Sequence, residues 1–177
     1  MNCLVVVAHP LKDSLCHYLS NKTISHLENK GYKVTVKDVY KENFNPVLTQ
    51  DERESYYQGP FDERLLQAEL KQLKEVESLV LIFPTWWFGF PAILKGWFDR
   101  VWAPGHAYEH ASDYGPMIKC LDNLKEMKVV TTLGSPWWVD NLVLRKPVKK
   151  ILKIELINKN KIILNFIFKS FFESANC

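Results

Sequence analysis

Five short apolar segments recur along the chain, and longer amphipathic or polar segments separate them. The stretch "NCLVVVAH" is apolar and rich in β-branched residues, which is typical of a strand buried on both faces. "SLVLIFP" has the same character and ends at a proline. The segments that we predict as strands cover residues 2–9, 32–40, 78–84, 127–134 and 161–168.

Helical periodicity fills most of the intervals between these strands. In "DSLCHYLSNKTISHLENKG", leucine and isoleucine recur at helical spacing, and Gly31 ends the segment as a glycine beyond a helix should. The interval 41–60 is polar and broken by prolines, so we expect an irregular excursion with one helical turn. The predicted helices cover residues 13–31, 62–77, 91–102 and 141–158, the last of them perturbed by Pro147.

Regular alternation of apolar strands with helices indicates an α/β protein with a parallel sheet and helices on both faces. Five strands in 177 residues fit the flavodoxin-like doubly wound order better than the six-stranded dinucleotide-binding order. We find no internal repeat, linker or low-complexity segment. A single flavodoxin-like domain over residues 1–177 is therefore expected.

Composition and charge exclude several classes of protein. The formal net charge is +3, and no compact basic run precedes the tail, which argues against nucleic-acid binding. The four cysteines form no CxxC pair and the five histidines show no ligand spacing, so we predict no metal site and no disulfide framework. With no basic leader and no long apolar run, we expect a cytoplasmic protein without a membrane span. A lysine cluster near the end of the chain is interpreted as a solvated helix face: Lys146, Lys149, Lys150 and Lys153.

The loops that follow the strands hold the candidate chemistry, because ligands of open α/β sheets bind at the carboxyl ends of the strands. The first loop, "HPLKDSLCH", runs into a helix whose free amides suit a phosphate, with His9 as a further donor. The alternative is that Asp13 or Ser14 merely caps the helix and that His9 is an ordinary strand terminus.

The second loop, "PTWWFG", carries three large aromatic side chains that cannot all face the core. Exposed aromatic rings at a ligand edge favour contact with a flat ring system, and Gly89 permits close approach of the backbone. The helix 91–102 that follows has a wide apolar face. That face is either core alone or partly a dimer contact.

The third loop, "TTLGSPWW", offers hydroxyls, a glycine and two tryptophans. Together the three loops supply a phosphate cradle, a platform for a flat ring and donors for a ring edge, which are the requirements of a flavin nucleotide. We can place no Ser-His-Asp, Cys-His or paired-carboxylate arrangement at this edge. That absence favours a reaction carried by a cofactor.

The stretch "FPTWWFGFPAILKGWFDRVW", with Ala107 and Tyr108 shortly after it, resembles the NAD(P)H:quinone oxidoreductase family of flavodoxin-like fold, which includes the DT-diaphorase and modulator-of-drug-activity-B types. The resemblance runs from "VVVAHPLKDSLCH" to the helix near Arg145. It implies a flavin whose phosphates lie near His9, Ser14, Leu15 and Cys16, whose ring lies against Pro84, Thr85, Trp86, Trp87 and Phe88, and whose polar edge meets Thr131, Thr132 and Gly134.

The same resemblance implies non-covalent FAD or FMN, NAD(P)H as co-substrate, and a homodimer with shared active sites. The loop "GHAYEHAS" would reach the partner's site, so Tyr108 and His110 are candidates to line the substrate slot, and Trp137 or Trp138 of the loop after the fourth strand is a candidate to wall it. The DT-diaphorase type has a tyrosine and a histidine after its fourth strand, but this chain reads "SPWWVDN" there. No catalytic residue is therefore assigned, and the choices between FAD and FMN and between NADH and NADPH stay open.

The expected function is a flavin-dependent NAD(P)H dehydrogenase that passes two electrons to a quinone or similar small acceptor by ping-pong hydride transfer. One alternative is a flavin-binding electron-transfer or ancillary regulatory protein, although a net charge of +3 is unlike the strongly acidic flavodoxins. A second alternative is a phosphate-binding protein that shares only the fold.

Overall fold

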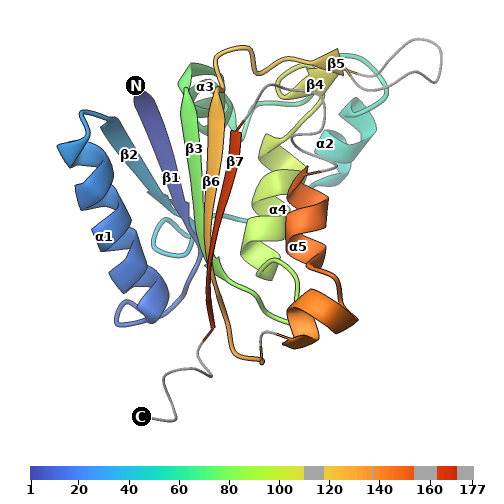
Figure 1. Ribbon diagram of the computed structural model, residues 1–177. Helices are drawn as coiled ribbons and strands as arrows, with labels where there is room; N and C mark the ends of the chain where they lie inside the picture. Colours follow the sequence, from blue (N-terminus) through green and yellow to red (C-terminus); the bar gives the residue numbers. More distant parts are fainter. Residues whose placement is uncertain (110–117, 137, 154–162, 171–177) are drawn as a thin grey trace.

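The computed structural model describes residues 1–109, 118–136, 138–153 and 163–170, the last range as backbone only. Its main sheet has five strands in the order β2-β1-β3-β6-β7, and every neighbouring pair is parallel (Figure 1). This order confirms the flavodoxin-like doubly wound prediction. The strands are β1 (Asn2–Val7), β2 (Lys33–Asp38), β3 (Ser78–Pro84), β6 (Glu126–Leu133) and β7 (Ile163–Ser170).

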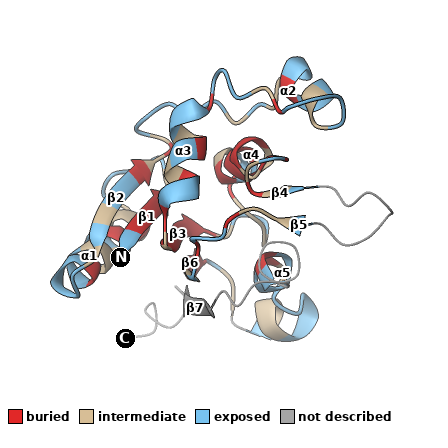
Figure 2. Ribbon diagram, turned by 90° about the horizontal axis from the view of Figure 1, so that it is seen from above, coloured by how far each residue is buried: buried red, intermediate tan, exposed pale blue. Residues whose placement is uncertain are grey.

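Helices cover both faces of the sheet, with α1 on one face and α3, α4 and α5 on the other (Figures 1 and 2). An antiparallel pair of two-residue strands, β4 and β5, lies beyond the carboxyl end of α4, and the sequence pattern did not predict it. The remaining elements are α1 (Leu15–Asn29), α2 (Gln50–Ser55), α3 (Gln67–Glu75), α4 (Ala92–Val101), β4 (Tyr108–Glu109), β5 (Ile118–Lys119), the short π-helix η1 (Val139–Val143) and α5 (Pro147–Ile151).

The central strand β3 has all seven of its residues buried. Its side chains alternate between two cores, because successive residues of a strand point to opposite faces. Leu79, Leu81 and Phe83 join the larger core with α3 and α4, whereas Val80 and Ile82 join the smaller core beneath α1. The uninterrupted apolar pattern of "SLVLIFP" thus reflects burial on both sides.

The predicted helix 141–158 is divided in the structure. Arg145 and Lys146 have φ angles of 55° and 56°, so the chain leaves the helical region between η1 and α5. Pro147 accounts for the position of the break, because its ring disfavours helical geometry at the preceding residue. Smaller shifts are seen elsewhere: α3 begins at Gln67 rather than at residue 62, and β7 lies two residues later than predicted.

The excursion between β2 and α3 contains the expected helical turn, α2, and is fastened to α4 by a buried ion pair. Arg100 Nε donates to Glu52 Oε2 at 2.9 Å, Arg100 Nη2 donates to Glu52 Oε1 at 2.5 Å, and Nη1 donates to the Asn45 carbonyl at 2.6 Å. Both charged side chains are almost fully buried. Glu52 also closes the capping box of α2 by accepting from the Thr49 amide at 2.9 Å.

A glycine allows the excursion to approach α4 closely. A Cβ atom at Gly96 would lie 2.2 Å from the carbonyl oxygen of Pro46. No other residue fits there without displacement of one of the two segments.

Replacement of Glu52 by glutamine (Glu52→Gln) should lower the free energy of unfolding by about 3–5 kcal/mol, because it leaves the buried Arg100 charge without its counter-ion. Urea denaturation measures the change. The control is Glu75→Gln, which breaks the exposed ion pair with Lys71 and should alter stability little. Equal effects of the two substitutions would contradict a special role for the buried pair.

Candidate cofactor site

The loops after β1, β3 and β6 meet at the carboxyl edge of the sheet and form an open pocket of about 480 Å³. That volume lies in the usual range for small-molecule sites. The structure brings together most of the predicted site residues, and adds Leu133 and Ser135 from the same "TTLGSPWW" loop. The lining residues are His9, Pro84, Thr85, Trp86, Trp87, Phe88, Thr132, Leu133, Gly134 and Ser135.

Thr132 connects the three loops. The Thr85 amide and hydroxyl both donate to the Thr132 carbonyl, at 2.8 and 3.0 Å. On its other side, the Thr132 hydroxyl lies 3.7 Å from Cys16 Sγ, which belongs to the first turn of α1. One strand-end residue therefore fixes the relative positions of the β1, β3 and β6 loops.

The first loop is ordered by two histidines. The Leu11 amide donates to His9 Nδ1 at 3.1 Å, and the Leu11 carbonyl oxygen lies 3.3 Å from the same nitrogen, so Nδ1 is engaged by the backbone of its own loop and Nε2 is the ring nitrogen left for a ligand. His17 Nε2 donates to the His9 carbonyl at 3.1 Å, while Ser14 Oγ caps α1 by accepting from the His17 amide at 3.3 Å. The capping role of Ser14 is thus confirmed. His17 was not predicted, and only its spacing of eight residues from His9 could have indicated it.

Four of the residues predicted to bind the cofactor do not line the pocket. Ser14 and Leu15 are half-buried at the start of α1, and Cys16 is buried beneath it, where desolvation raises the pKa of its thiol. Thr131 is fully buried and shares a face of β6 with Val129, opposite Thr132, because strand residues alternate. Contact of these residues with a cofactor stays a prediction.

The second loop is a strained aromatic turn, here defined as Trp86–Gly89. The Gly89 amide donates to the Trp86 carbonyl at 3.0 Å, and the two central residues, Trp87 and Phe88, have φ angles of 50° and 58°. Positive φ at both positions is the pattern of a type I′ turn, which normally holds asparagine or glycine. Left-handed geometry costs roughly 1–3 kcal/mol for each such residue.

Trp87 is 98% exposed, so packing within the protomer does not offset this strain. The rings of Trp86 and His9 lie 6.0 Å apart, so the platform and the first loop form one surface. Strain combined with an exposed indole at a pocket is characteristic of a ligand site rather than of a core.

The helix that follows the aromatic turn is largely core. Trp97 and Phe98 of α4 are buried in the larger core, whereas Ile93 and Trp102 are half-buried at its margin. The core role of this face is confirmed. Its role in a dimer stays a prediction.

Tyr108 is the one residue predicted to line the substrate slot that the structure describes, and it does not line the pocket of its own protomer. Tyr108 lies in β4, at the end of the sheet opposite the β1–α1 loop (Figure 1). It is half-buried near α2, and desolvation raises the pKa of its hydroxyl. His110 and Trp137 lie outside the described residues.

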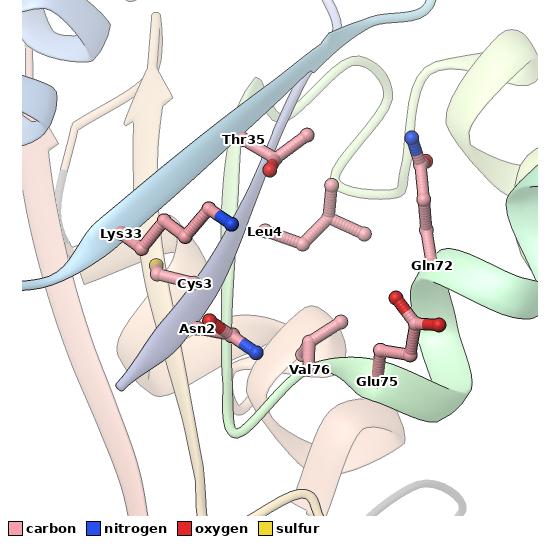
Figure 3. Close-up of a pocket in the computed structure, with 8 residues that line it drawn as sticks. All are labelled: Asn2, Cys3, Leu4, Lys33, Thr35, Gln72, Glu75 and Val76. Carbon is pink, nitrogen blue, oxygen red and sulfur yellow. The ribbon is translucent and has the colours of Figure 1, made fainter.

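Two other hollows are lined neither by the aromatic turn nor by the loops after β1, β3 and β6. One of about 110 Å³ lies at the amino ends of β1 and β2, where Asn2, Lys33 and Glu75 surround the buried Leu4 (Figure 3). It is too small for a nucleotide. A larger one, of about 700 Å³, lies between α1 and the sheet and reaches toward the amino end of β6, away from the carboxyl ends of the strands.

Among the described residues, no group of three or more histidine, cysteine, aspartate or glutamate side chains could hold a metal ion. No helix in the same part of the chain is long and apolar enough to cross a membrane.

Comparison with known proteins identifies the class. A family model described as "Flavodoxin-like fold" matches residues 1–153. The chain is 35% identical over 136 residues to an uncharacterized NAD(P)H oxidoreductase of Haemophilus influenzae, covering 76% of this chain and 65% of that protein. It is 33% identical over 150 residues to rat NAD(P)H dehydrogenase [quinone] 1, covering 75% of this chain and 53% of that protein.

Solved structures agree with this assignment. The crystal structure of Smu.1420 from Streptococcus mutans superposes with a TM-score of 0.82 at 26% identity, covering 98% of this chain and 89% of that chain. The general stress protein 14 of Treponema denticola, solved in complex with FMN, gives a TM-score of 0.60 at 25% identity, covering 99% and 89%.

The chain therefore belongs to the family of flavodoxin-like fold. Within that family its relatives are NAD(P)H oxidoreductases and quinone dehydrogenases, as the resemblance of the aromatic stretch implies. The chain spans between about half and two thirds of the length of these two curated relatives.

Replacement of Trp87 by asparagine (Trp87→Asn) should raise the stability of the ligand-free protein by about 1 kcal/mol, because asparagine tolerates positive φ and the exposed indole loses little packing. Thermal unfolding without added cofactor measures it. Trp138→Asn is the control, because Trp138 is also exposed but has an ordinary φ of −69°. A similar change in both variants would show that backbone strain is not the cause.

Proposed function

We propose that the protein is a flavin-dependent NAD(P)H dehydrogenase that reduces a quinone or similar small acceptor. The observation that carries this proposal is the exposed, strained indole of Trp87 at a pocket whose walls also include the polar side chains of His9, Thr85, Thr132 and Ser135. An aromatic platform beside hydrogen-bond donors suits a flat heterocycle joined to a phosphate.

The residues present fit a flavin mononucleotide unit. His9 Nε2 and the amides at the start of α1 would hold the phosphate, and Trp86 and Trp87 would lie against the ring. Gly134 leaves space at the ring edge, since no atom lies within 4 Å of a Cβ built there. When bound, the flavin supplies the hydride chemistry, and the protein positions the ring and its partners.

Few protein groups at the pocket can move a proton. Of the described lining residues, His9 is the one titratable side chain. Its Nδ1 is occupied by the Leu11 amide, so its role is to hold a ligand through Nε2. Protons for a reduced acceptor would come from water, which reaches the open pocket directly.

A homodimer is part of the proposal. Tyr108 lies far from the pocket of its own protomer, so it could line a substrate slot only in the site of a second copy. A single slot for NAD(P)H and for the acceptor, used in turn, predicts ping-pong kinetics. The free thiols of Cys3, Cys16 and Cys120 support the proposed cytoplasmic location.

The first test is cofactor binding. Purified protein should take up FMN or FAD, and the flavin released by denaturation can be identified and then tested with NADH, NADPH and a panel of quinones and azo compounds. Protein that is colourless and binds neither flavin on titration would eliminate the proposal. Rapid bleaching of the flavin by NADPH in one step would favour the dehydrogenase over the alternative electron-transfer or ancillary protein.

Two tryptophans provide a matched pair of substitutions. Trp87→Ala should weaken flavin binding roughly tenfold or more, because it removes stacking area beside the ring, with little change in stability. Trp97→Ala should instead lower stability by about 3–5 kcal/mol, because this side chain is 1% exposed in the core. Flavin titration and urea denaturation measure the two effects. Loss of stability alone in both variants would refute a platform role for Trp87.

A further inference from the structure

The segment 138–153, which we name the basic-apolar segment, exposes apolar and basic side chains together. Leu142 is 66% and Val143 is 61% exposed, although both are aliphatic. These residues belong to η1, the orange ribbon below α5 in Figure 1. Neighbouring exposed apolar residues mark a surface that binds something. The full set of exposed apolar residues is Trp138, Leu142, Val143, Leu144 and Ile151.

The charges of the same segment are nearly all positive. Its one acidic residue is Asp140, which is partly buried. Its exposed cations are Arg145, Lys146, Lys149, Lys150 and Lys153. A partner for this surface must therefore accept both aliphatic side chains and a cluster of positive charge.

An anionic lipid bilayer meets both requirements. Interfacial segments combine lysine and arginine with tryptophan and leucine, which enter the boundary between headgroups and acyl chains. A nucleic acid would match the charge but offers no apolar layer for Leu142 and Val143. A second copy of this chain would offer apolar area, but an isologous contact centred on this segment would bring two clusters of positive charge close together, which is unfavourable.

The segment also adjoins the pocket. Ser135 lines the pocket, and Trp138 follows it by three residues at the start of the segment. We propose that residues 138–153 dock the protein on an anionic lipid bilayer, with the pocket opening beside the membrane surface. The docking is inferred from the exposure and the charge of these side chains. Docking would also give the pocket access to acceptors dissolved in the lipid, and this benefit rests on the proposed function.

The test is co-sedimentation of the full-length protein with large vesicles, measured without nicotinamide or acceptor. One set of vesicles is phosphatidylcholine alone, and the other is an equimolar mixture of phosphatidylcholine and phosphatidylserine. The protein should sediment with the mixed vesicles and stay in solution with the neutral ones. Added salt should release it, because screening weakens contacts between exposed charges.

Two double variants separate the charge from the apolar contribution. Lys150→Gln with Lys153→Gln should lower the partition coefficient for mixed vesicles about 30-fold. Leu142→Ser with Val143→Ser should lower it roughly tenfold. The matched controls alter equally exposed residues elsewhere: Lys41→Gln with Lys71→Gln, and Val47→Ser with Leu65→Ser.

The outcomes are distinguishable. Failure to sediment with mixed vesicles, or equal loss in the segment and control variants, overturns the docking proposal. If Leu142→Ser with Val143→Ser converts a dimer to a monomer and vesicle binding is retained, the surface belongs to a contact with a second copy instead. Because reduction of a water-soluble quinone is assayed separately, a negative vesicle result leaves the proposed function untouched, and the reverse also holds.

Discussion

Parallel pairing of β3 with both β1 and β6 is the constraint on which the rest of the structure depends. Parallel neighbours require a crossover between strands, and these crossovers supply the helices that bury β3 completely. The same pairing sends every strand end to one edge of the sheet. For that reason loops that begin near His9, Thr85 and Leu133, far apart in sequence, form a single pocket. The position of the site is thus a consequence of sheet direction, and only its chemistry is set by the loop residues.

The loops achieve that chemistry by different physical means. The β1 and β6 loops are stabilised by hydrogen bonds, through Ser14 and Thr132 respectively. The aromatic turn instead holds Trp87 and Phe88 in left-handed geometry with little burial to offset it. Strain of this kind persists where function requires a fixed orientation of a side chain. A flat ligand against Trp87 would supply the contact area that the protomer itself does not.

The sequence pattern predicted the fold and most of the pocket, since both follow from local composition. Apolar runs predicted the five strands, and the residues after β3 predicted an exposed aromatic surface. Other features depend on contacts between distant segments. The Arg100–Glu52 pair joins residues 48 positions apart, and the capping-box spacing of Thr49 and Glu52 indicates a helix start but not the burial of Glu52 against Arg100. The alternation of β6 explains why Thr131, unlike Thr132, faces away from the pocket, but a pair of threonines does not reveal which one faces the ligand.

Gly96 has a consequence for how the molecule opens. Pro46 lies against this glycine, and Asn45 and Glu52 are both held by Arg100, so the excursion and α4 are joined by a close backbone approach and a buried ion pair. If the two segments separated, the charge of Arg100 or Glu52 would be left in an apolar environment without its partner. They should therefore exchange their amide hydrogens as one cooperative unit. Since α4 begins directly after the aromatic turn, a ligand that rigidifies the turn would slow exchange as far away as residues 44–56.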